Sequence, residues 1–141
     1  RSSSNYTLTV KTASGTGYIM PVGATALVYS DGTNTALGML QKSYVTHTAA
    51  YTAVAGDQVF CDTKTTNAFT VSLPAGAVGS EVTLIDSQNY FASNNLTIDS
   101  NGSEKINSSA SNLVLSTNGQ AITLVYANAT VGWIYKTNSA S

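Results

Sequence analysis

The side chains that could do acid-base or metal chemistry are few and widely spaced in this sequence. His47 is the only histidine, which excludes sites built from several imidazoles and leaves at most one imidazole base. An exposed or interface position in a connecting segment explains His47 better than catalysis. No spacing identifies a facing pair, such as a glycosidase needs, among the single carboxylates Asp31, Asp57, Asp62, Glu81, Asp86, Asp99 and Glu104. We therefore expect no enzymatic activity.

Two of these carboxylates flank a short apolar stretch, and one cysteine lies inside it. Asp57 and Asp62 suit turn capping through backbone N–H groups, because the sequence lacks the closely spaced oxygen ligands of a calcium loop. Cys61 has no partner for an intrachain disulfide and is expected to be a small buried side chain. The stretch Gly15–Gly17 lacks the lysine and helix of a phosphate-binding loop and is expected to be a turn. We expect no cofactor and no metal.

Aromatic side chains are the remaining candidates for binding, because sugars stack on exposed tyrosine and tryptophan rings. Trp133 lies on an apparent core face and is expected to anchor the core. Tyr90 and Phe91 stand in the polar stretch 87–95 and are the candidate ligand or partner contacts. The same stretch could instead bury them against a neighbouring subunit.

The composition excludes several classes of protein. The 141 residues are 43% hydrophobic and only 9% charged, with a net charge of -1. Such a chain lacks the basic excess that binds nucleic acid or an anionic membrane surface, and no apolar stretch is long enough for membrane insertion. The 20 Thr, 18 Ser and 12 Asn residues favour strands joined by many short turns. Because the chain opens with Arg1, we expect it to be part of a longer polypeptide.

Short strand-like segments recur along the chain and predict an all-β fold, a β-sandwich of short antiparallel strands. Apolar residues alternate with period two, and the predicted core residues are Phe69, Val71, Leu73, Val82, Leu84, Ile122, Leu124, Tyr126, Val131, Trp133 and Tyr135. Pro74 should end the strand before it. Asn118-Gly119 predicts a hairpin over 115–121, and Asn101-Gly102 and Asp31-Gly32 predict further tight turns.

An internal similarity suggests how the chain is organised. Leu8-Thr-Val10 followed by Ala26–Thr33 parallels Leu96-Thr-Ile98 followed by Thr123–Thr130. One interpretation is that residues 1–40 are the closing half of a preceding module in a tandem array; the other is chance similarity of two hydroxyl-rich β segments. We expect an N-terminal β segment over 1–40, a linker over 41–50, a β-sandwich module over 51–137 and a tail over 138–141.

Several motifs follow one another in order between Tyr51 and Lys136. They are Tyr51-Thr-Ala-Val-Ala-Gly-Asp57 with Asp62-Thr63, Phe69-Thr-Val-Ser-Leu-Pro74, Gly79-Ser-Glu-Val-Thr-Leu-Ile-Asp86, Asn95-Leu-Thr-Ile-Asp99, Thr123-Leu-Val-Tyr126 and Gly132-Trp133. In this order they resemble a module of tail-fibre, tailspike-adaptor and baseplate proteins of tailed bacteriophages. The opening, Leu8–Gly17 with Val28–Thr33, is similar to segments of podophage fibre proteins.

The resemblance implies a non-enzymatic structural part of a virion appendage, a fibre or baseplate, that attaches or spaces a host-recognition fibre. It implies a homotrimer that contacts other virion proteins and is assembled in the host cytoplasm, with no nucleic-acid partner. Tyr6, Tyr44, Tyr51 and the linker over 41–50 are then the candidates for the subunit interface. The alternative is a receptor-binding domain at a fibre tip that binds a host surface glycan through Tyr90 and Phe91.

Overall fold

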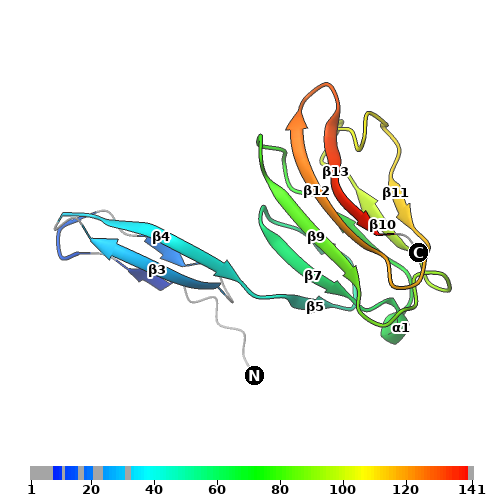
Figure 1. Ribbon diagram of the computed structural model, residues 1–141, viewed down its shortest axis with the longest axis horizontal. Helices are drawn as coiled ribbons and strands as arrows, with labels where there is room; N and C mark the ends of the chain where they lie inside the picture. Colours follow the sequence, from blue (N-terminus) through cyan, green and yellow to red (C-terminus); the bar gives the residue numbers. More distant parts are fainter. Residues whose placement is uncertain (1–7, 11, 16–17, 21–23, 31–32, 140–141) are drawn as a thin grey trace. The chain divides into compact units, whose positions relative to one another are not determined.

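The computed structural model describes residues 8–10, 12–15, 18–20, 24–30 and 33–139, and the chain divides into two compact units, Arg1–Ser43 and Tyr44–Ser141. In the first unit, β1 (Leu8–Val10) pairs with β2 (Tyr18–Met20), and β3 (Ala24–Ser30) pairs with β4 (Thr35–Lys42). Both pairs are antiparallel and each forms a two-stranded sheet (Figure 1). The turn predicted at Asp31-Gly32 lies outside the described residues, as do Tyr6, Thr16 and Gly17.

The second unit is the all-β sandwich predicted from the sequence, built from two packed sheets (Figure 1). One sheet has the strand order β13-β12-β9-β7-β5 and the other the order β11-β10-β8-β6. The strands are β5 (Val45–His47), β6 (Tyr51–Thr52), β7 (Asp57–Cys61), β8 (Phe69–Ser72), β9 (Glu81–Asp86), β10 (Leu96–Asp99), β11 (Leu113–Leu115), β12 (Ala121–Asn128) and β13 (Gly132–Ser139). A single helical turn, α1 (Thr63–Thr66), follows β7.

Strand pairing differs from the antiparallel arrangement that the sequence predicted, because both sheets are mixed. In the larger sheet β7 runs parallel to β5 and β9, whereas β12 is antiparallel to β9 and β13. In the smaller sheet β8 runs parallel to β6 and β10, and β11 is antiparallel to β10. Alternation of period two fixes which side chains face the core but not the direction of the neighbouring strand.

The core lies between the two sheets and contains most of the residues expected there. Trp133 and Cys61 are fully buried, which confirms both predictions. Phe69 and Val131 are only half-buried, and Tyr135 keeps 37% of its surface exposed. The predicted core residues that are buried are Val71, Leu73, Val82, Leu84, Ile122, Leu124, Tyr126 and Trp133.

The turns predicted from Asn-Gly pairs form, but they do not join the strands that the sequence predicted. The backbone N–H of Gln120 donates to the Thr117 carbonyl (3.2 Å) and Gly119 has a positive φ of 72°, so the Asn118-Gly119 turn forms. The hairpin prediction over 115–121 is nevertheless wrong, because β11 and β12 lie in different sheets and the turn crosses between them. Likewise Gly102, with φ 57°, lies in a long connection between β10 and β11 rather than in a tight hairpin. β8 ends at Ser72, shortly before Pro74, as predicted.

The segment expected to be a linker, residues 41–50, contains strand structure. β4 continues to Lys42, and β5 is an edge strand of the five-stranded sheet. The division between the two units falls between Ser43 and Tyr44. The short strand Val45–His47 lacks an alternating apolar pattern because an edge strand buries little of its surface.

Candidate functional site

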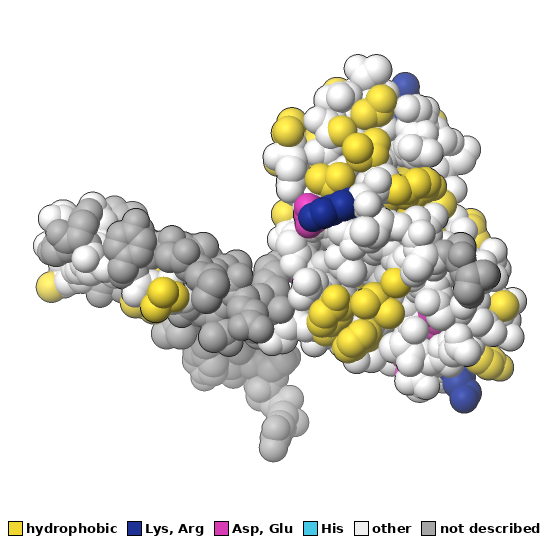
Figure 2. Space-filling model, viewed as in Figure 1, with side chains coloured by type: hydrophobic (Ala, Val, Ile, Leu, Met, Phe, Trp, Pro, Cys, Tyr) yellow, Lys and Arg dark blue, Asp and Glu magenta, His cyan; other side chains and the backbone are white. Residues whose placement is uncertain are grey.

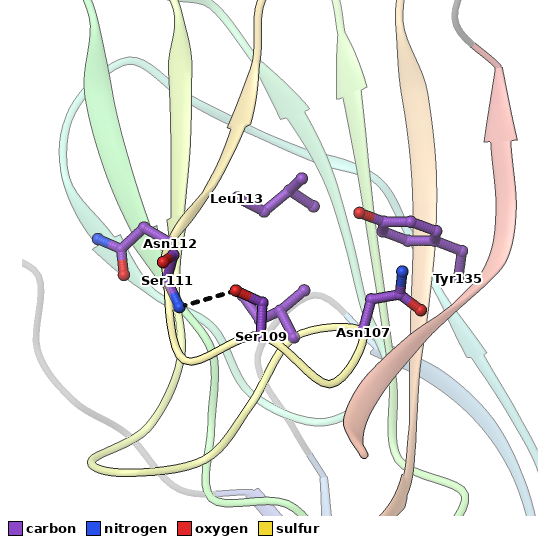
Figure 3. A pocket seen from close by; sticks show the side chains of 7 residues that line it. Asn107, Ser109, Ser111, Asn112, Leu113 and Tyr135 are labelled. Atoms are coloured by element: carbon purple, nitrogen blue, oxygen red, sulfur yellow. Dashed lines mark hydrogen bonds between the residues drawn. The ribbon is translucent and has the colours of Figure 1, made fainter.

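A pocket opens at the side of the sandwich where the edge strands β11 and β13 face each other. Its volume is about 190 Å³, and Leu113 on β11 and Tyr135 on β13 point toward one another across it (Figure 3). The long connection between β10 and β11 closes one end. The lining residues are Ile106, Asn107, Ser109, Ser111, Asn112, Leu113 and Tyr135.

Backbone hydrogen bonds fix this connection against β13. The Trp133 N–H donates to the Lys105 carbonyl (2.8 Å), and the Asn107 N–H donates to the Trp133 carbonyl (2.6 Å). Ile106 and Ser109 exchange N–H···O bonds of 2.8 and 2.9 Å, which closes a tight loop. The rim of the pocket is therefore held by the backbone, independently of the polar side chains that line it.

Gly132 and Glu104 also fix the connection between β10 and β11 against β13. A Cβ on Gly132 would lie 1.9 Å from the Lys105 carbonyl oxygen, and its φ is 75°, so only glycine allows this approach. Glu104 accepts the indole N–H of Trp133 at 3.1 Å and the backbone N–H of Gly76 at 2.8 Å. The buried indole and the pocket loop are thus parts of one hydrogen-bonded unit.

The chemistry of the pocket is that of a small polar ligand site with one aromatic wall. The hydroxyl of Ser109 accepts the Ser111 N–H at 3.1 Å, while the amide of Asn107 lies beside the Tyr135 ring (Figure 3). The Asn112 amide points away from the centre of the pocket in the same view. The volume is below the roughly 300–1,000 Å³ typical of drug-sized ligands, so the pocket has room only for a smaller group.

The two contact residues expected from the sequence are placed differently from the expectation. Phe91 is fully buried in the core, so its assignment as an exposed contact is wrong. Tyr90 is half-buried, and the Lys64 ammonium lies 5.8 Å from the centre of its ring. The Phe91 backbone N–H donates to the Asp86 carboxylate at 3.0 Å, which fixes the turn that carries the buried ring. This contact connects residues five apart and has no sequence signature.

The carboxylates around β7 cap turns, as predicted. Asp62 accepts the N–H groups of Lys64 (3.1 Å) and Thr65 (3.0 Å) and the Thr65 hydroxyl (2.7 Å) at the start of α1. The Thr65 hydroxyl bond is the main cause that lowers the pKa of Asp62. Asp57 accepts the Val54 N–H at 2.8 Å.

His47 belongs to a small packed cluster with Tyr51 and Asp57, next to the turn that Asp57 caps. Its ring stacks on Tyr51 at 3.7 Å between centroids, and the Tyr51 hydroxyl donates to Asp57 at 2.6 Å. Burial and this hydrogen bond raise the pKa of Tyr51 to about 12, so the phenol stays protonated at neutral pH and is a poor base. Burial likewise raises the pKa of Cys61 to about 12. Over the described residues, no group of three or more His, Cys, Asp or Glu side chains could hold a metal ion.

A second surface feature crosses the outer face of the five-stranded sheet. The Tyr44 ring stacks on Phe60 at 4.6 Å, and Phe60 is paired across β7 and β9 with Ile85. We call Tyr44, Phe60 and Ile85 the outer stripe; Tyr44 is 42% exposed and the other two are half-buried. Figure 2 shows hydrophobic patches on the second unit surrounded mainly by uncharged atoms, with few charged groups. Such patches favour contacts with another protein.

No family model and no curated protein matches the chain. Among the described residues, no helix is long and apolar enough to cross a membrane. The pocket was missed from the sequence because Tyr135 was assigned to the core face. The polar run from Asn107 to Asn112, directly before β11, is the signal that could have drawn attention to it.

Proposed function

We propose that the protein is a non-enzymatic structural component of a phage virion appendage, a fibre or baseplate, that attaches or spaces a host-recognition fibre as a homotrimer. The observation that carries the proposal is the order of the motifs that resemble the phage module. They fall on β6 and the turn into β7, on β8, β9, β10 and β12, and on the start of β13, and so run through both sheets of one sandwich. Its partners are other virion proteins.

The outer stripe on the five-stranded sheet is the surface feature that supports the proposed trimer. It combines an exposed aromatic ring on the approach to β5 with two half-buried apolar side chains, and β5 leaves one edge of its sheet without a neighbouring strand among the described residues. Covering such a stripe removes apolar surface from water. The low charge of the chain lets identical copies approach without strong repulsion. Of the expected interface residues, Tyr44 belongs to the stripe, whereas Tyr51 is engaged with His47 and Asp57.

Light scattering over a dilution series tests the assembly. We expect a mass near three times 14.6 kDa that persists on dilution. We expect Tyr44→Asp to shift the mass toward 14.6 kDa, because it places a charge in a stripe that the proposed trimer would bury. Val78→Asp is the matched control, because Val78 is a more exposed apolar residue outside the stripe. A monomer at every concentration would contradict the proposal, and an unchanged trimer with Tyr44→Asp would remove the stripe from it.

The pocket between β11 and β13 favours a second function, the binding of a host surface glycan at a fibre tip. Amides, hydroxyls and an aromatic wall are the groups that bind sugars in proteins, and Tyr135 supplies the wall. In this second proposal the glycan contacts are Tyr135 and Asn107, because Phe91 is buried in the core.

A glycan array followed by titration calorimetry tests this second function. Tyr135→Ala and Asn107→Ala are each expected to weaken binding by about tenfold or more, because they remove the stacking ring and a facing amide. Asn112→Ala is the control, since its amide points out of the pocket (Figure 3). Glycan binding that survives Tyr135→Ala would exclude the pocket, and no binding to any glycan would exclude the function.

A further inference from the structure

The first unit repeats the strand arrangement of the closing half of the sandwich. In both, a short antiparallel pair (β1 with β2, β10 with β11) is followed by an antiparallel hairpin (β3 with β4, β12 with β13). The hairpins match closely: one and the same offset in residue number relates Ala24 to Ala121, Thr35 to Gly132 and Lys42 to Ser139.

The register of the two hairpins agrees as well. Tyr29 is paired with Ala36 and Val28 with Leu37, just as Tyr126 is paired with Trp133 and Val125 with Ile134. The partners in the second hairpin stand at the same separations along the chain. Each hairpin also contains a register irregularity, after Leu27 in the first and before Leu124 in the second, so the partners differ at the leucine: Leu27 pairs with Met39 and Leu124 with Tyr135. Similar composition alone does not produce matching strand bounds and register, so the sequence similarity reflects a shared fold.

The first unit and the closing half of the sandwich differ in the strands that lie beside them. In the sandwich, β12 lies between β13 and β9, and β10 lies between β11 and β8. In the first unit, β3 pairs with β4 and β1 pairs with β2, each in a sheet of two strands among the described residues. Among the described residues of this unit, the positions that β9 and β8 occupy in the complete module therefore have no counterpart.

The exposure of one pair of corresponding leucines shows this difference. Leu124 is fully buried between the five-stranded and the four-stranded sheet, whereas its counterpart Leu27 is 63% exposed. A large apolar residue with this exposure, on a strand that pairs with only one neighbour in the described part of the chain, is a surface that natural β proteins normally cover.

We propose that the open edges of β3 and β1 receive an added half-module, a polypeptide segment whose strands correspond to β9 and β8. The strand beside β3 would run antiparallel to it, as β9 does to β12, and the strand beside β1 would run parallel to it, as β8 does to β10. Leu27 then becomes a core residue. A second folded sandwich cannot supply these strands, since its β9 is flanked by β12 and β7 and its β8 by β10 and β6. The inference does not depend on the proposed virion role.

A fusion chain tests the proposal. Asn95 directly precedes Leu96, the counterpart of Leu8, so residues 44–95 can be joined in front of residues 8–141 in the connection that the complete module uses. We expect amides of β3 that exchange with solvent in the parent chain to exchange at least about tenfold more slowly in the fusion, because the added strand pairs with them. The control fusion carries Val82→Asp and Leu84→Asp in the added copy only, and should leave β3 as in the parent.

Leu27→Asp gives an independent measurement. In the parent chain it should leave the exchange of β3 unchanged, and in the fusion it should abolish the protection, because a charge would then lie in a core. Equal exchange of β3 in parent and fusion would overturn the proposal. So would protection that survives Leu27→Asp, or β3 amides that are already protected in the parent by a second copy of the chain.

Discussion

Trp133→Ala is expected to lower the free energy of unfolding by about 3–5 kcal/mol, the range typical of truncating a fully buried tryptophan. The indole is fully buried, meets the Tyr126 ring edge-on at 5.6 Å, and donates its N–H to Glu104 at 3.1 Å. Truncation removes all three contributions and leaves a cavity beneath the loop that forms the pocket. The loop should then also exchange its amides faster, because its anchor to β13 has lost its packing.

Urea denaturation followed by circular dichroism measures this loss, since Trp133 is the only tryptophan and its fluorescence disappears with it. Trp133→Phe is the matched variant: it keeps most of the apolar volume, loses the bond to the Glu104 carboxylate and should cost about 2 kcal/mol. Labelling of the buried Cys61 thiol gives a second readout, because the thiol reacts only when the core opens. A Trp133→Ala variant as stable as Trp133→Phe would show that packing of the indole contributes little.

The core of the sandwich could be predicted from the sequence because strand periodicity is a local property. Val82 and Leu84, or Ile122 and Leu124, alternate with half-buried neighbours, and each pair is buried as expected. Pairing is not local. The chemistry of Asn118-Gly119 specifies a turn but not the sheet that the next strand joins, which is decided by the packing of the whole chain.

The candidate site was less predictable, since it depends on contacts between distant segments. Tyr135 has the same parity as Trp133 on β13, so the pattern assigns both to the core. The edge position of β13 leaves Tyr135 facing the opening between the sheets, where it forms the wall of the pocket. Tyr90 and Phe91 stand in a polar segment whose composition suggests exposure, yet Phe91 is fully buried, and its backbone N–H donates to a carboxylate at the end of β9.

That carboxylate, Asp86, joins two turns that are far apart in the sequence. It is almost fully buried. One oxygen accepts the N–H groups of Tyr90 (2.7 Å), Phe91 (3.0 Å) and Gly119 (3.0 Å), and the other accepts the Gln88 N–H at 3.2 Å. The first turn turns Phe91 into the core, and the second carries the chain from one sheet to the other. A single side chain therefore satisfies backbone donors that no strand can reach.

Asp86→Ala is expected to cost roughly 3–5 kcal/mol of unfolding free energy, because it leaves four backbone donors without their acceptor, one of them in a buried bond and three in part-buried bonds. Asp86→Asn should cost less, since the amide oxygen can still accept the three N–H groups that meet at one carboxylate oxygen. Some cost remains, because the NH₂ group then faces the Gln88 N–H, which is also a donor. Asp99→Ala is the matched control: it removes a carboxylate at the end of β10 that makes no hydrogen bond within the described residues, and should change stability by less than about 0.5 kcal/mol. Urea denaturation, with hydrogen exchange at Phe91 and Gly119, measures the three variants. If Asp86→Ala were as stable as Asp99→Ala, water would be able to replace the carboxylate at both turns, and the inward position of Phe91 would have to come from apolar packing alone.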